Sequence, residues 1–67
     1  MSGAILTNRQ REVLWLVSYG HTRNEIADNL GISPETVKDH MRDMRWRLGA
    51  RTNSQAVAYG FQKGILL

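Results

Sequence analysis

The residues of this sequence that could do chemistry are mostly cations, and they are concentrated in one stretch. Of the nine Lys and Arg residues, five lie between residues 38 and 51: Lys38, Arg42, Arg45, Arg47 and Arg51. Lys38 and Arg42 are spaced so that they share one face of a helix. Arginine can bind a guanine through two hydrogen bonds and lysine can reach the same acceptors, and a good pair discriminates between bases by roughly 1–3 kcal/mol. On an arbitrary helix the same pair is more often a solvated face, so the helix that carries them decides between the two interpretations.

The arrangements needed for catalysis or metal binding are not found in the sequence. His21 and His40 have no third ligand at a spacing typical of zinc, and the chain contains no Cys. Gly31 and Gly49 fit the ends of helices rather than a phosphate-binding loop. Ser33 is better explained as a helix cap than as a nucleophile. We therefore expect no enzyme, no metal and no cofactor.

Length, composition and charge narrow the class of protein further. A chain of 67 residues, 42% of them hydrophobic, is enough for one small domain with a modest core. The net charge of +3 points toward a polyanionic partner, although many plain soluble domains share it. No apolar run is long enough to span a bilayer, and residues 1–4 lack the features of a signal peptide, so the cytoplasm is the default location. These features exclude a multidomain enzyme, a membrane protein and a secreted disulfide scaffold.

Helix caps predict an all-α fold of four helices, near residues 8–19, 23–30, 34–48 and 53–63. Thr7 with Gln10, and Thr22 with Glu25, have the spacing of capping boxes. Apolar residues at helical spacing then predict the faces that form the core. These are Val13, Leu14 and Val17; Ile26, Ala27 and Leu30; Val37, Met41, Met44 and Leu48; and Ala56, Val57, Gly60 and Phe61.

The link between the second and third helices predicts how those helices cross. It consists of three residues, Gly31, Ile32 and Ser33, and Pro34 then occupies the first helical position. A link this short, with glycine at its start, forces the third helix to leave at a steep angle. Residues 23–48 therefore predict a helix-turn-helix unit, in which the second helix of the unit lies in the major groove of DNA.

Four segments of the chain resemble the LuxR/GerE-type DNA-binding domain. They are LTNRQREVL from Leu6, NEIADNLGISPETVKDHM from Asn24, RLGAR from Arg47 and QAVAY from Gln55. The resemblance runs from Leu6 to about Leu66 without a gap. It implies a single compact, tetra-helical domain over residues 1–67, belonging to a bacterial-type transcriptional regulator. The third helix of such a domain reads the major groove, and the fourth commonly supplies a dimer contact.

Carried over by position, the resemblance also implies roles for individual residues. The base-facing residues are Lys38, Asp39 and Arg42, and the phosphate-facing residues are Arg23, Asn24, Thr36, His40, Arg47 and Arg51. Asp39 could accept a hydrogen bond from cytosine N4 or repel phosphate. His40 has a structural, half-buried role as its alternative. Arg45 and Arg47 point in different directions, so at most one shares the groove surface and the other is solvated or paired with Asp43.

Three residues depart from the pattern of the family. Trp15 and Trp46 stand where such domains often carry polar or charged residues, and both fall outside the apolar stripes. Either each packs partly on a neighbouring helix, or one or both form a surface for a partner. Asn53 stands where relatives often place a basic residue, so one possible phosphate contact is missing there.

The resemblance to a DNA-binding domain also predicts the partners of the chain. Two copies bind a roughly palindromic or repeated site in double-stranded DNA, because one recognition helix reads too few base pairs. The candidate dimer surface is formed by Tyr59, Gln62 and Lys63. We expect a monomer or a weak homodimer without DNA and a stronger homodimer on DNA. The expected location is the cytoplasm, with the nucleoid. The alternative is a protein-interaction module for another regulator or an RNA polymerase subunit, with weak or no DNA binding. No membrane and no small-molecule ligand is expected for this chain.

Overall fold

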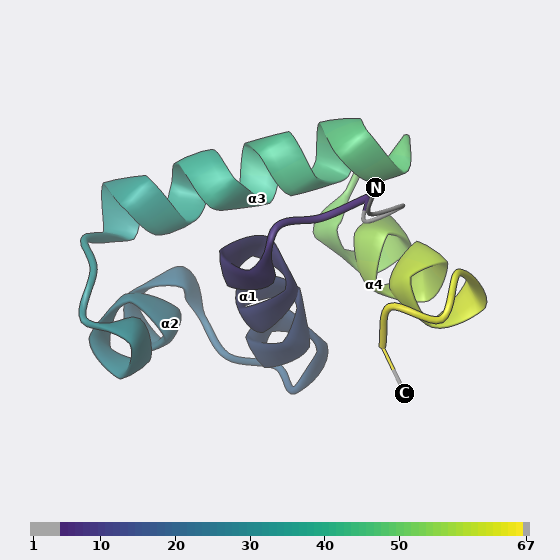
Figure 1. The fold of residues 1–67 in the computed structure, drawn as a ribbon. Helices are drawn as coiled ribbons and strands as arrows, with labels where there is room; N and C mark the ends of the chain where they lie inside the picture. The colour runs from purple at the N-terminus through teal and green to yellow at the C-terminus, as the bar shows by residue number, and fades with distance from the viewer. Residues whose placement is uncertain (1–4, 67) are drawn as a thin grey trace.

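The computed structural model describes residues 5–66, which fold into four α-helices (Figure 1). They are α1 (Asn8–Ser18), α2 (Arg23–Leu30), α3 (Pro34–Leu48) and α4 (Asn53–Gln62), and no strand occurs in the described range. The predicted all-α, four-helix fold is confirmed. Helices α1 and α4 end one residue earlier than predicted, because Tyr19 and Lys63 are their C-caps. The expectation that residues 1–4 carry no signal peptide lies outside the described residues.

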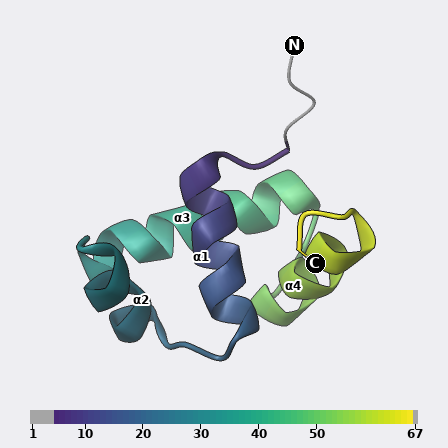
Figure 2. The ribbon, with the colours of Figure 1, turned by 60° about the horizontal axis from the view of Figure 1, so that its bottom comes forward.

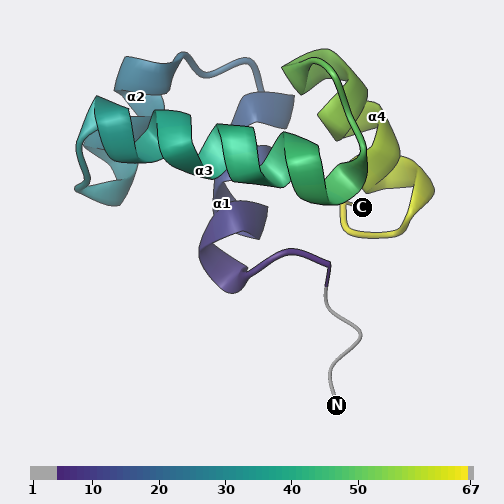
Figure 3. The ribbon, with the colours of Figure 1, turned by 90° about the horizontal axis from the view of Figure 1, so that it is seen from above.

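Helix α3 lies across one side of the domain, and α1 crosses beneath it (Figures 1 and 2). Helix α2 packs on one side of α1 and α4 on the other, and each of them also contacts α3. Seen from above, α3 is the outermost helix along its whole length (Figure 3). One face of α3 therefore belongs to the core and the opposite face is left open.

The start of every described helix is fixed by a hydroxyl side chain. Each accepts a hydrogen bond from the backbone N–H three residues further on, and the four caps are Thr7, Thr22, Ser33 and Thr52. In α1 and α2 the third helical residue completes a capping box, since the side chains of Gln10 and Glu25 accept from the cap N–H groups. Each cap contributes on the order of 1 kcal/mol. These local signals explain why the sequence predicts the helix starts correctly.

The core is built around the buried stripe of α3. Its buried hydrophobic residues are Leu6, Val13, Leu14, Ile26, Ala27, Val37, Met41, Met44, Leu48, Ala56 and Leu66. Leu30, Val17 and Val57 are half-buried and pack against this cluster. The predicted stripe of α3 is therefore the actual one, and the predicted stripes of α1 and α2 are largely so.

The prediction that Phe61 belongs to the core is wrong, since its side chain is 51% exposed. The reason is the close approach of α4 to α1 at Gly60, where a Cβ would lie 2.9 Å from Leu14 Cδ2. Phe61 is the next residue and is turned about 100° away from that contact. The chain reverses at Gly64, and Leu66 returns to the core, donating its N–H to the Gly60 carbonyl at 3.0 Å.

The turn between α2 and α3 sets the direction of α3. Gly31 ends α2 in the left-handed conformation, with φ of 69°. Ile32 then donates its N–H to the Ala27 carbonyl at 3.1 Å and packs its half-buried side chain against the core. Ser33 follows at once as the N-cap of α3. The predicted helix-turn-helix arrangement of α2 and α3 is present.

Replacing Gly31 tests how much this turn depends on the left-handed conformation. A Cβ at residue 31 would meet no atom within 4 Å, so the cost of Gly31→Ala comes from the backbone alone. We expect Gly31→Ala to lower the free energy of unfolding by about 1 kcal/mol, and Gly31→Asn to lower it less, because Asn tolerates this conformation better. Urea unfolding measures both. An alanine variant as stable as the wild type would contradict this role for Gly31.

Candidate nucleic-acid interface

The open side of α3 carries the base-facing residues that the sequence predicts. Asp39, Arg42 and Trp46 are all exposed, and their spacing of three and four residues aligns them opposite the buried stripe. Lys38 is also exposed and lies on one shoulder of this side. We call the surface made by Lys38, Asp39, Arg42 and Trp46 the open face of α3. The structure brings the three predicted base-facing residues together on it.

An ion pair on the open face fixes the direction of one of these side chains. Arg42 Nη2 lies 3.4 Å from Asp39 Oδ1, and both side chains are mostly exposed. Exposed pairs of this kind stabilise a protein by about 0–1 kcal/mol. The contact therefore orients the guanidinium at little cost, and a stronger acceptor can displace Asp39 from it.

The residues predicted to face phosphate lie on several sides of the open face. Thr36, His40 and Arg47 follow one line along α3, on the shoulder opposite Lys38. Thr36 is held by Ser33, since its N–H and hydroxyl both contact Ser33 Oγ, at 3.1 and 2.8 Å. His40 is half-buried and Arg47 is exposed.

Arg45 and Arg47 point in different directions, as predicted, but neither is paired with Asp43. Arg47 Nη1 donates to the Ile5 carbonyl at 3.3 Å, and Arg45 Nη1 donates to Asn53 Oδ1 at 2.7 Å. Within residues 5–66 no ion pair includes Asp43. The partners of the two arginines come from other elements, which helical spacing alone does not reveal.

Arg51 lies in the turn from α3 to α4, directly before Thr52, the N-cap of α4. Its side chain is exposed and its N–H donates to Gln55 Oε1 at 2.6 Å, so the backbone is tied to the first turn of α4. Arg51 therefore extends the row of cations beyond the end of α3.

The N-terminus of α2 places Arg23 and Asn24 near the α1–α2 turn. The Glu25 carboxylate accepts from the Thr22 N–H at 2.8 Å and lies 3.8 Å from His21 Nδ1. The Thr22 backbone N–H is the main cause that lowers the pKa of Glu25 below its usual 4.5. The Glu25 carboxylate therefore occupies the Thr22 N–H, while Arg23 and Asn24, the first two residues of α2, remain exposed beside it.

Arg45 is not among the residues that the sequence predicts to face bases or phosphates. Its half-buried side chain lines a hollow together with Arg23 and Lys38, although these three residues come from two different helices. The spacing of Lys38 and Arg45 by seven residues places them on one side of α3. This spacing is visible in the sequence, but it indicates a shared hollow only once the position of α2, which carries Arg23, is known.

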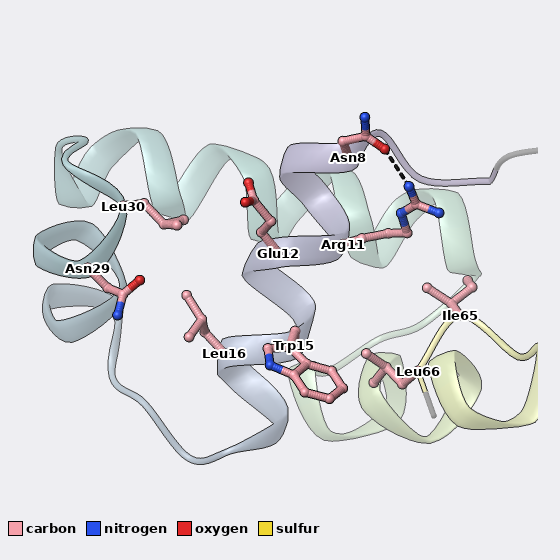
Figure 4. A pocket seen from close by; sticks show the side chains of 9 residues that line it. All are labelled: Asn8, Arg11, Glu12, Trp15, Leu16, Asn29, Leu30, Ile65 and Leu66. Atoms are coloured by element: carbon pink, nitrogen blue, oxygen red, sulfur yellow. Dashed lines mark hydrogen bonds between the residues drawn. The ribbon is translucent and has the colours of Figure 1, made fainter.

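The two tryptophans lie on different surfaces. Trp46 is 83% exposed on the open face, so it does not pack on a neighbouring helix. Trp15 is 40% exposed and packs edge-to-face on Tyr19, with 4.9 Å between the ring centroids. Trp15 also lines a second hollow, between α1, the end of α2 and the C-terminal segment (Figure 4). Leu30, Ile65 and Leu66 share that hollow.

The candidate dimer residues on α4 do not all point outward. Gln62 and Lys63 are exposed, but Tyr59 is half-buried and packs against the core. The outer side of α4 is instead formed by Ala58, Phe61 and Gln62. Helical spacing left Tyr59 off the core stripe, but in the folded domain its side chain packs against the core cluster.

Two properties of the described residues concern membranes and metal ions. None of the helices is sufficiently long and apolar to cross a lipid bilayer. Among residues 5–66, no three side chains of the metal-binding types gather in one place.

Comparison with known proteins identifies the family. Residues 4–59 match the family model for bacterial regulatory proteins of the luxR family. The chain belongs to this family. Among solved structures, the luxR-family fold seen here is similar to the transcription factor GerE, with a TM-score of 0.91, 31% identity and 96% of both chains covered. It is also similar to Vibrio cholerae VqmA in a ligand and DNA complex, with a TM-score of 0.85, 32% identity, and 97% of this chain and 29% of that one covered.

Curated relatives place the same domain within longer regulators. The transcriptional activator AhyR of Aeromonas hydrophila is 42% identical over 92% of this chain and 24% of its own length. The HTH-type transcriptional activator RamA of Corynebacterium glutamicum is 44% identical over 91% of this chain and 22% of its own. The chain thus spans about a quarter of these relatives. Fold and family together make it a helix-turn-helix domain for DNA-binding transcription regulation.

Proposed function

We propose that the chain binds double-stranded DNA sequence-specifically, with α3 in the major groove. The observation that carries the proposal is the open face of α3, which presents Lys38 and Arg42 outward from a helix whose opposite side is buried. Lys38, Asp39 and Arg42 contact base edges in this proposal. Phosphates are contacted by Arg23, Asn24, Thr36, His40, Arg47 and Arg51.

The charges around α3 support a polyanionic partner. Within the described chain, no carboxylate lies within ion-pair distance of Lys38, Arg45 or Arg47. These cations lie on both shoulders of the helix, where the two strands bordering a major groove would run. Neutralising phosphates in this way gives affinity, and the base contacts then give specificity.

The remaining expectations of the sequence analysis are proposals that follow from this function. Residues 1–67 act as one DNA-binding domain, without catalysis and without a cofactor. The unit acts in the cytoplasm, with the nucleoid, because that is where its target lies in a bacterial cell.

Alanine substitutions on the open face test base reading. We expect the affinity of the wild type for duplex DNA to fall steeply with salt. Lys38→Ala and Arg42→Ala should each cost about 1–3 kcal/mol on the preferred site and relax the base preference at different positions. Fluorescence anisotropy across a salt series, with a selection from random duplexes, measures both effects. Arg11→Ala is the matched control, because Arg11 lines the hollow near Trp15 instead (Figure 4).

A wild-type protein that binds no duplex even at low salt would contradict this function. The second candidate would then gain support, namely a protein-interaction module for another regulator or an RNA polymerase subunit. Trp46 is the observation that favours this candidate, since a tryptophan that is 83% exposed is a frequent kind of interface hot spot. Such a module would show little salt-dependent affinity for DNA.

We also propose that two copies associate on DNA through the outer side of α4. Phe61 is 51% exposed there, beside Ala58, and has no role in the core. Helix α4 lies at the far end of α3 from α2, so a contact through it leaves both open faces uncovered (Figure 1). A similar structure is described as a VqmA dimer, with a TM-score of 0.84 to this chain.

Substitution of Phe61 tests the α4 contact. We expect Phe61→Glu to abolish cooperative binding to a duplex with two half-sites and to leave affinity for a single half-site within about twofold. The reason is that the two contacting copies would repel one another while the open face is unchanged. Gel-shift titration on both duplexes measures this. Unaltered cooperativity in the Phe61→Glu variant would exclude this surface.

A further inference from the structure

A hollow of about 500 Å³ lies where the α1–α2 turn, α3 and the start of α4 meet. Its wall carries three cations, Arg23, Lys38 and Arg45, and the described residues that line it include no carboxylate. A concave surface lined by one sign of charge concentrates counter-ions more strongly than a flat one. The lining therefore favours an anion.

Arg45 is held in this hollow by a neutral partner. Its Nη1 donates to Asn53 Oδ1 at 2.7 Å, while Asn53 Nδ2 contacts Met41 Sδ at 3.7 Å. The amide of Asn53 is thus oriented by the buried stripe of α3 and presents its oxygen to the guanidinium. A guanidinium has five N–H donors, so this bond leaves most of them for another acceptor.

The neutral partner distinguishes Arg45 from Arg9 and Arg42, the two arginines of the described residues that pair with carboxylates. Arg9 and Arg42 lie 3.3 and 3.4 Å from the carboxylates of Glu12 and Asp39. Asn53, in contrast, fixes the position of the Arg45 side chain without cancelling its charge. Arg45 is therefore both preorganised and still cationic, which lowers the cost of binding an anion.

Two helix starts add positive potential at the same place. Thr22, the N-cap of α2, and Asn53, the first residue of α4, both line the hollow. The first N–H groups of a helix have no partner within it, and its N-terminal end carries a partial positive charge. At α2 the Glu25 carboxylate, which accepts from the Thr22 N–H at 2.8 Å, offsets part of this potential, whereas the first turn of α4 carries no acidic residue and acts in the same direction as the three cations.

We propose that this hollow is a phosphate-binding notch that takes one phosphodiester of the DNA backbone, with Arg45 as its main ligand and Asn53 as the residue that positions Arg45. The inference rests on the proposed function, and it adds a phosphate contact that the sequence analysis did not assign. Arg23 borders the same phosphate from α2. Because Lys38 lies in the wall of the notch and on the open face, a phosphate held there fixes the register of α3 in the groove.

The salt dependence of DNA binding tests the notch. We expect Arg45→Gln to reduce the slope of log affinity against log salt by about 1 and to weaken binding about tenfold at about 0.1 M salt. The loss should be similar for preferred and random duplexes, with the base preference unchanged. Asn53→Asp should reduce the slope similarly, because its carboxylate would neutralise Arg45 without removing it. Arg9→Gln is the matched control and should leave the slope unchanged.

A neutral phosphate substitute locates the contact on the DNA. Replacing one phosphate at a time by methylphosphonate should reveal a position that weakens the wild type and has no further effect on Arg45→Gln. Equal slopes for wild type and Arg45→Gln, or full methylphosphonate penalties at every position in the variant, would overturn the notch while the proposed function stands. Failure of the wild type to bind any duplex would instead overturn the proposed function. Urea unfolding confirms that both variants are folded.

Discussion

The structure depends on the burial of one stripe of α3 against the other three helices. Val37 and Met44 are fully buried, and Met41 and Leu48 nearly so. Burying a side chain of this size stabilises a protein by roughly 1.5–3 kcal/mol, a large share of the stability of so small a domain. The same stripe fixes the rotation of α3 about its axis. A rotation by one residue would bring Lys38 into the core without a partner, so packing and the direction of the cations are set together.

The helix starts and the core stripe of α3 could be predicted because their signals are local. Caps act over three residues, and an apolar stripe is visible in the spacing along one helix. The places of Phe61 and Leu66 could not be predicted in the same way. They depend on how closely α4 approaches α1 at Gly60 and on where the chain reverses, and both are properties of helices packed together.

The candidate site shows the same division between local and non-local information. Helical spacing was sufficient to place Lys38, Asp39 and Arg42 on one open surface. It was insufficient for Arg45, whose partner lies across the turn between α3 and α4. From the sequence, Asn53 marks a position where a basic residue is missing. In the structure, the guanidinium of Arg45 on α3 contacts Asn53, so α3 supplies the positive charge that is missing at residue 53.

The most direct test of the account is to map the surface of the domain that duplex DNA contacts. Amide and indole NMR signals, followed during titration with the preferred duplex, report each region separately. We expect shifts in the exposed residues of α3 and at the start of α2, including the indole signal of Trp46, with the indole of Trp15 unchanged. Shifts confined to Trp15 and the hollow beside it, with α3 unaffected, would contradict the central claim that the open face of α3 binds DNA.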